Sequence, residues 1–352
     1  MKRILIYRPG ALGDTIVAVP TIQALRRAYP DAALALMTVH LDTGIWADQV
    51  LREFAWFDDV ITYAPGDLRK PSRVVALWRR VRRFGADAVV HLSSEQNSPA
   101  RILRDRAFFA LAGIPQFVGG AAASVTWYGR RRTDDRLYPF EVDRLLAFAA
   151  EAGAAAPGRR PVFDLPIGDA ARARVDALLD EPSFEPGRML IGLCPGSRQP
   201  AKRWPVERYG TVGRRLIDTH DASIVVVGGE QERAVGEQIG RAWPQGRWLN
   251  AASRLSILEM AELLRRCVFY LGNDTGPMHV AAAVGTRCVA VFGAQYPENS
   301  WHPYGDDHIV IRRRPSCRNC FLTECTRHAT RCLTEITADD VWAACERLLV
   351  YR

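Results

Sequence analysis

Apolar strand patterns alternate with helical patterns through both halves of the chain, and this alternation constrains the fold more than any other feature. In the first half, the strand patterns include KRILIYRPG, AALALMTVH and DVITYA. In the second half, they are MLIGLCPGS, ASIVVVGG, VFYLGND and RCVAVFG. Strands separated by helical segments are typical of βαβ units. Each half is therefore predicted to be α/β, with a doubly wound parallel sheet.

Length and composition favour two domains. The chain has 352 residues, of which 48% are hydrophobic, enough to bury large cores. A stretch with several prolines interrupts the alternation after Pro161, so we place one domain at 1–165, a linker at 166–188 and a second domain at 189–336. Thr337, followed by Asp339 and Asp340, predicts a C-terminal helix over 337–352.

Charge and cysteine content narrow the class of protein. No apolar run reaches the roughly 18 to 20 residues that cross a bilayer, and no signal-peptide pattern is present, so a cytoplasmic protein is expected. The formal net charge of +8 favours anionic partners. The candidate classes are nucleic acid, a membrane surface and a phosphorylated substrate. In a reducing compartment, the eight cysteines are expected to be free thiols or metal ligands.

The loop after the first strand, RPGALGD, carries two glycines and an acidic residue. Gly10 and Gly13 suit a phosphate-binding turn, but Asp14 stands where a pyrophosphate would have to approach. A carboxylate at this place could be a general base. The alternative interpretation is that Asp14 only caps the helix that starts near Thr15.

Two loops of the second half suit a diphosphate. CPGSRQPAKRWP follows a strand and offers Ser197 and Lys202 as a hydrogen-bonding group and a cation. In YLGNDTGPMHV, Asp274 and Thr275 stand between a strand and a helix, where backbone N–H groups bind phosphate. Asp274 would repel a phosphate unless it faces a sugar hydroxyl or a neighbouring cation. A solvated basic turn and an ordinary helix cap are the alternatives.

Together these loops resemble those of the family 9 glycosyltransferases, the heptosyltransferases that build the inner core of bacterial lipopolysaccharide. The resemblance covers most of the chain, and RPGALGD, PGS…KRWP, VVVGGEQE, RLSILEMAELLRRC and NDTGPMHVAAA follow the family order. It implies a GT-B fold of two facing Rossmann-like domains, inverting transfer of a heptose from ADP-heptose, and no catalytic metal. Arg198 departs from the family pattern, in which a small hydroxyl residue often stands at this position.

The resemblance also implies roles for individual residues. Asp14, in the acceptor-binding first domain, is expected to be the general base that deprotonates the acceptor hydroxyl. The second domain is expected to bind the donor: the diphosphate to Ser197, Arg198, Lys202, Thr275 and Gly276, the ribose to Glu232, the base to Leu255 and the sugar to Asp274, with His279 behind the phosphates.

Residues 317–332 form a C-x2-C-x4-C-x6-C array. Four thiolates so close in sequence, Cys317, Cys320, Cys325 and Cys332, suit a structural iron or zinc, and His328 could replace one of them. Similar arrays occur in enzymes resembling autotransporter heptosyltransferases, where the resemblance implies a structural iron. The alternative is a set of reduced cysteines that pack a loop.

The acceptor and the surroundings of the enzyme stay open at this point. A lipid A or core-type acceptor is expected first, a protein such as an autotransporter or a secondary metabolite is the nearest alternative, and a non-catalytic nucleotide or polyanion binder is the alternative from another class. The basic pattern RKPSRVVALWRRVRRFG favours either peripheral association with the inner membrane or simple core packing of its apolar face. No nucleic-acid partner is expected.

Overall fold

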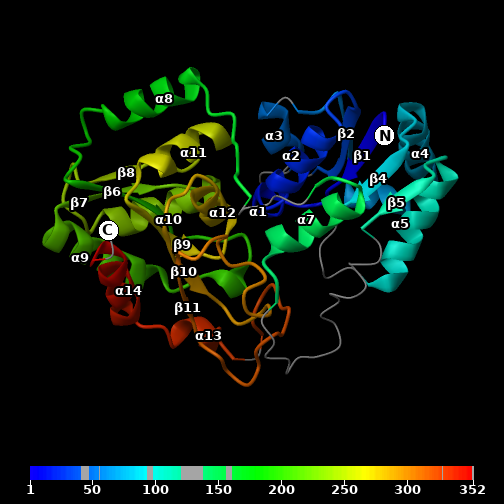
Figure 1. Ribbon diagram of the computed structural model, residues 1–352. Helices are drawn as coiled ribbons and strands as arrows, with labels where there is room; N and C mark the ends of the chain where they lie inside the picture. Colours follow the sequence, from blue (N-terminus) through cyan, green and yellow to red (C-terminus); the bar gives the residue numbers. More distant parts are fainter. Residues whose placement is uncertain are drawn as a thin grey trace. The chain divides into compact units, whose positions relative to one another are not determined.

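The computed structural model describes residues 1–40, 47–54, 56–92, 98–119, 138–155, 161–326 and 328–350. The chain divides into two compact units (Figure 1). The N-terminal unit comprises Met1–Arg131 and Pro139–Asp164, and the C-terminal unit comprises Arg132–Tyr138 and Leu165–Arg352. Each unit is an α/β structure with its own sheet and core, and each is treated separately below.

The sheet of the N-terminal unit has five parallel strands in the order β3-β2-β1-β4-β5. Their bounds are β1 (Arg3–Tyr7), β2 (Ala33–Val39), β3 (Asp59–Tyr63), β4 (Ala88–His91) and β5 (Gln116–Val118). Tyr7 at the end of β1 is in register with Met37 on one side and His91 on the other. The strand order reverses beside β1, so the loop after β1 opens at the place where α/β sheets bind ligands.

Helices connect these strands, and their apolar sides pack against the sheet. They are α1 (Leu12–Ile16), α2 (Val19–Ala28), α3 (Ala47–Glu53), the 3-10 turn η1 (Pro65–Arg69), α4 (Pro71–Phe84), α5 (Pro99–Leu111) and α7 (Glu141–Glu151). Leu77, Val81 and Phe84 of α4 lie in one core cluster with Phe109 of α5. The apolar side of the basic segment RKPSRVVALWRRVRRFG therefore packs in the core, while its arginines are exposed.

The sheet of the C-terminal unit has six parallel strands in the order β11-β10-β9-β6-β7-β8. Their bounds are β6 (Met189–Cys194), β7 (Ala222–Val226), β8 (Trp248–Asn250), β9 (Phe269–Asn273), β10 (Cys288–Phe292) and β11 (Ile309–Arg312). All residues of β7, β9 and β10 are buried, as expected for strands covered on both faces. The order reverses between β6 and β9, which places the loops after these two strands at the ligand-binding edge.

The helices of this unit are α8 (Asp169–Leu179), the 3-10 turn η3 (Pro200–Lys202), α9 (Val206–His220), α10 (Glu230–Gly240), α11 (Ile257–Arg266), α12 (Gly276–Ala283), α13 (Arg331–Thr334) and α14 (Ala338–Val350). The segment predicted as a linker, 166–188, includes α8. The helix predicted at 337–352 is α14, whose last described residue is Val350, and it packs on α9, β10 and β11.

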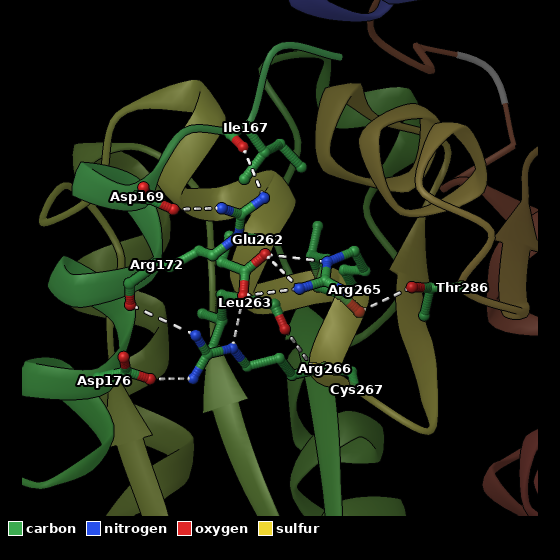
Figure 2. A network of polar contacts seen from close by, with 11 residues as sticks. Ile167, Asp169, Arg172, Asp176, Glu262, Leu263, Arg265, Arg266, Cys267 and Thr286 are labelled. Carbon is green, nitrogen blue, oxygen red and sulfur yellow. Dashed lines mark hydrogen bonds and ion pairs between the residues drawn. The ribbon is translucent and has the colours of Figure 1, made fainter. Parts of the chain in front are cut away.

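A network of ion pairs holds α8 against α11 (Figure 2). The carboxylate of Glu262, fully buried on α11, accepts hydrogen bonds from Arg265 Nε at 2.9 Å and Arg266 Nε at 2.7 Å. Arg266 Nη1 reaches across to Asp176 Oδ1 on α8 at 2.5 Å, and the Thr286 hydroxyl donates to Leu264 O at 2.7 Å. Because α8 contacts α11 in this way, it belongs to the C-terminal unit.

Within the ranges that the structure describes, no helix combines the length and the apolar character needed to cross a membrane.

Candidate active-site loops

Asp14 lies in the first turn of α1, directly after the loop that follows β1. Its Oδ2 accepts a hydrogen bond from the Ala11 N–H at 3.1 Å, so the capping role considered for Asp14 is present. Its Oδ1 lies 3.7 Å from Arg8 Nη2, and 30% of the side chain is exposed. The carboxylate is thus held at both oxygens and is still accessible.

Gly10 makes room for this arrangement. A Cβ atom at residue 10 would lie 2.4 Å from Asp14 Cβ, which is closer than any real contact. The glycine that resembles part of a nucleotide-binding turn therefore serves the close approach of Asp14 to the loop backbone.

Sequence reasoning missed Arg8, which is fully buried at the end of β1. Its Nε donates to Asp14 O at 2.8 Å, its Nη2 donates to the same oxygen, and its Nη1 donates to Leu92 O after β4. An arginine directly after four buried apolar residues was the available signal, because a charged side chain there needs partners inside the protein.

The loop after β6 is tightly organised. Ser197 is buried, its Oγ accepts a hydrogen bond from Gln199 N at 3.3 Å, and its carbonyl accepts one from Arg203 Nε at 2.6 Å. Arg198, predicted as a diphosphate ligand, is exposed. The loop therefore offers a fixed backbone and an exposed arginine.

Lys202 and Asp274 form a largely buried ion pair. Lys202 Nζ lies 2.7 Å from Asp274 Oδ2, and the two side chains are 13% and 6% exposed. The same ammonium lies 5.1 Å from the ring centroid of Tyr296. This is the neighbouring cation that sequence reasoning required of Asp274, so Asp274 need not repel an anion that binds here.

Asn273 ties this ion pair to the loop after β6, and sequence reasoning assigned it no role. It is fully buried, and its Nδ2 donates to Pro195 O at 2.8 Å and Gly196 O at 3.2 Å. Its Oδ1 accepts from Trp204 N at 3.1 Å and from the Tyr209 hydroxyl at 2.8 Å. One amide side chain therefore fixes both ends of the loop that contains Ser197 and Lys202.

The Thr-Gly turn after Asp274 leads into α12 as predicted. Thr275 is extended and stands just before the helix, which starts at Gly276 and has Pro277 in its first turn. His279 is buried on the same helix, with its ring centroid 6.0 Å from that of Trp301. Unpaired N–H groups of the first turn are a recurrent anion-binding element at the carboxyl edge of a parallel sheet.

Glu232 follows β7 in the chain, and Leu255 follows β8. Glu232 lies in the first turn of α10, where its Oε2 accepts a hydrogen bond from Gly229 N at 2.9 Å. A Cβ atom at residue 196 would lie 2.4 Å from Glu232 Oε1, so this carboxylate adjoins the loop of Ser197. Leu255 is half-buried two residues before the start of α11.

The contacts thus join the candidate donor residues Ser197, Lys202, Glu232 and Asp274 through Asn273 and Gly196 in the C-terminal unit. Asp14 lies in the N-terminal unit.

The four cysteines of 317–332 line one small cavity together with His328 and Ala201. Burial, together with the neighbouring thiols of Cys317, Cys320 and Cys325, raises the pKa of Cys332. Among the described residues, no three His, Cys, Asp or Glu side chains already have the arrangement of a metal site. The four cysteines therefore share one cavity, without the geometry of a metal site in the part of the chain that the structure describes.

Comparisons with known proteins agree with this architecture. Residues 74–330 match the model of the family described as glycosyltransferase family 9 (heptosyltransferase). Lipooligosaccharide heptosyltransferase 2 of Haemophilus influenzae is 30% identical over 195 residues, which cover 51% of this chain and 54% of that protein. Lipopolysaccharide heptosyltransferase 2 of Escherichia coli K12 is 26% identical over 315 residues and 84% of each chain.

A solved structure extends the comparison to the fold. The structure of E. coli ADP-heptose lipopolysaccharide heptosyltransferase II is 23% identical, has a TM-score of 0.70 and covers 99% of both chains. With two parallel sheets of Rossmann-like order, the prediction of a GT-B fold is confirmed.

Proposed function

The chain belongs to glycosyltransferase family 9, and from this membership we propose that the enzyme moves a heptose from ADP-heptose to a hydroxyl group of the lipopolysaccharide inner core. The names of the E. coli and H. influenzae relatives support a lipopolysaccharide-type acceptor, and the E. coli structure supports ADP-heptose as the donor. The observation that carries the proposal is the polar cluster after β6 and β9, where Lys202, Asp274 and the start of α12 come together.

In the proposed reaction, the Asp14 carboxylate takes the proton of the acceptor hydroxyl while the hydroxyl oxygen attacks the anomeric carbon of the heptose. The bond between that carbon and the diphosphate oxygen breaks, ADP leaves with the bonding electrons, and the configuration at the anomeric carbon is inverted. Asp14 suits this role because its carboxylate is held in place yet 30% exposed.

Charge builds up on the diphosphate as this bond breaks, and fixed donors lower the barrier by stabilising it. We assign this task to Ser197, Arg198 and Lys202, together with the N–H groups at Thr275 and Gly276. Asp274 is left to accept hydrogen bonds from the donor sugar while Lys202 balances its charge. Glu232 is assigned to the ribose and Leu255 to the base, with His279 behind the phosphates.

The direct test is transfer itself. The purified enzyme is incubated with ADP-heptose and a panel comprising a heptose-free core acceptor, a candidate acceptor protein and a secondary metabolite, and the products are identified by mass spectrometry. We expect one added heptose on the core acceptor, loss of transfer in Asp14→Asn, and normal transfer in Asp31→Asn, which changes an exposed carboxylate of the same unit. Absence of transfer to every acceptor, or full transfer by Asp14→Asn, contradicts the proposal.

The cysteine array is proposed to hold a structural iron or zinc. Support comes from residue type and place: four cysteines line one cavity, and these metals prefer thiolate ligands. Cys317, Cys320, Cys325 and Cys332 would hold the ion, which stabilises the loop and takes no part in transfer. Elemental analysis of the purified protein should find one metal ion per chain, and Cys320→Ser/Cys325→Ser should lose it, whereas Cys267→Ser, a buried cysteine elsewhere, should keep it.

The enzyme is also proposed to be cytoplasmic and peripheral to the inner membrane, through the exposed basic side of α4. Arg73, Arg79 and Arg83 are exposed there, and Val75 is 43% exposed among them. Such a face is attracted to anionic headgroups. Sedimentation with vesicles containing anionic lipid should exceed that with neutral vesicles and should fall in Arg79→Glu/Arg83→Glu. The control, Arg214→Glu on α9, should sediment like the wild type.

A further inference from the structure

A buried series of alternating charges leads from α7 to Asp14. Arg8 is fully buried, and besides its contact with Asp14 its Nη1 lies 3.9 Å from Glu141 Oε1. Glu141 stands at the first residue of α7 and accepts two hydrogen bonds from Arg144, from Nε and from Nη2, each at 2.6 Å. The side chains of Glu141 and Arg144 are 2% and 3% exposed. The order Asp14, Arg8, Glu141, Arg144 alternates in sign.

Such a series is costly to bury. Removing charged groups from water costs several kcal/mol for each ion, and buried ion pairs often contribute no more stability than well-packed apolar residues. Burial of this series is therefore weak evidence for stability and points to a demand for fixed geometry. The end of the series that reaches an accessible group is Asp14.

We propose that Arg8 is a positioning residue for the base, and that Glu141 and Arg144 hold Arg8 in place. This inference rests on the proposed role of Asp14. Arg8 fixes residue 14 in two ways, because its Nε and Nη2 bind the backbone oxygen of Asp14 and its charge attracts Oδ1. With Oδ2 bound by the Ala11 N–H, the carboxylate plane has one orientation. Misplacement of a reacting group by about 1 Å can cost about 100-fold in rate.

Glu141 performs the matching task for Arg8. A long arginine side chain has many rotamers, and a fixed carboxylate near its Nη1 selects the one that reaches Asp14. The bidentate contact with Arg144 in turn fixes the Glu141 carboxylate, because two parallel hydrogen bonds define its plane. Helix α7 thereby sets the orientation of the Asp14 carboxylate through Arg8.

The test is a double-mutant cycle measured on kcat. Arg8→Lys keeps the charge but loses the forked contact with Asp14 O, and we expect kcat to fall about 10- to 100-fold. The affinity for ADP, measured by calorimetry, should stay unchanged because the donor residues lie in the other unit. In an Asp14→Asn background, Arg8→Lys should cause no further loss, since the group that it positions is already disabled.

Arg26→Lys is the matched control. Arg26 belongs to the same unit and also donates to backbone oxygens, to Ala32 O at 2.7 Å and to Trp56 O at 2.8 Å. Both of these partners lie outside the loop that carries Asp14. Its substitution should lower the unfolding temperature without lowering kcat. Equal losses of kcat from Arg8→Lys and Arg26→Lys would overturn the inference, because both would then act through stability alone.

Glu141→Gln provides a second variant if Arg8→Lys does not fold. It keeps the shape of the side chain and removes its charge, and kcat should fall several-fold, again only when Asp14 is present. If Arg8→Lys and Glu141→Gln both leave kcat within twofold while Asp14→Asn retains only a small residual kcat, the positioning role is wrong and the proposed function stands. If Asp14→Asn itself transfers normally, the proposed function fails first.

Discussion

In the N-terminal unit, Gly10 lies against Asp14, and in the C-terminal unit Gly196 lies against Glu232. A Cβ atom at either glycine would stand 2.4 Å from the acidic side chain. In both places the carboxylate sits in the first turn of a helix and accepts a hydrogen bond from a backbone N–H, Ala11 N at 3.1 Å or Gly229 N at 2.9 Å. Both units therefore place a glycine against a helix-capping carboxylate at the carboxyl edge of a parallel sheet, although Gly10 shares a loop with Asp14 whereas Gly196 belongs to the loop after β6 and Glu232 follows β7.

The charged residues around Asp14 differ from those around the loop of Gly196. Asp14 is paired with an arginine that is buried behind it, which leaves the carboxylate as the accessible group. Beside Gly196, the ion pair of Lys202 and Asp274 balances a carboxylate with a cation, and Arg198 is exposed. The two proposed tasks follow this difference, with an accessible carboxylate as the base in one unit and a loop that we propose binds the diphosphate in the other.

The largest effect is expected from breaking the ion pair of the C-terminal unit. Lys202→Met leaves the carboxylate of Asp274 buried without its cation, which should cost about 3–5 kcal/mol of unfolding free energy. Urea denaturation measures this loss. Adding Asp274→Asn should recover much of the stability but not the affinity for ADP. A loss of less than about 1 kcal/mol of unfolding free energy in Lys202→Met would contradict the claim that Asp274 depends on this ion pair for its burial.

The next largest effect is expected from Gly10→Ala, in the loop after β1 of the N-terminal unit. In Gly10→Ala, the new methyl group would collide with Asp14 Cβ, an atom fixed to the helix backbone, so the carboxylate must move. We expect kcat to fall about 100-fold at unchanged ADP affinity. The control is Gly66→Ala in the same unit, where a Cβ atom meets nothing within 4 Å. A loss of ADP affinity in Gly10→Ala would show that this loop binds the nucleotide after all.

The sequence predicted the fold well because its signals are local. Buried parallel strands have continuous apolar runs, such as LIGLC and VVVGG, and each is followed by a helical period, so both sheets could be expected from spacing alone. The structure of segment 166–188 was harder to predict. Its helix α8 is held by contacts between Asp176 and Arg266, which are far apart in the sequence.

The place of the candidate loops in the fold could be predicted for the same reason, since residues directly after a strand lie at the carboxyl edge of a parallel sheet. The partners that organise these loops could not. Arg8 depends on Leu92 and Glu141, and Asn273 on Pro195 and Trp204, all brought together only by the strand order. The spacing of residues in one sequence does not reveal which distant residues come into contact.

Asn273 offers a third way to separate the two loops. In Asn273→Asp, the shape of the side chain is kept, but a carboxylate cannot donate to Pro195 O and Gly196 O. We expect a loss of about 2 kcal/mol of unfolding free energy together with weaker ADP binding. Asn250→Asp, which also removes two amide donations but at a more exposed site, should lose clearly less. Equal losses would mean that burial of Asn273 has no special weight.

The smallest effect is expected from Gly196→Ala, although its contact distance equals that of Gly10→Ala. The new methyl group would meet Oε1, Cγ and Cδ of Glu232, at 2.4, 2.7 and 2.9 Å, which belong to the outer part of a long side chain rather than to a Cβ atom fixed to a helix. The carboxylate can rotate away, so ADP affinity should fall less than tenfold, which is about 1.4 kcal/mol, and kcat should not change. Adding Glu232→Ala makes room for the methyl group but removes the hydrogen bond to Gly229 N, so it should cost about 1 kcal/mol of stability. A fall in kcat at constant ADP affinity would contradict the division of tasks, because the loop after β6 would then act in the chemical step as Asp14 does.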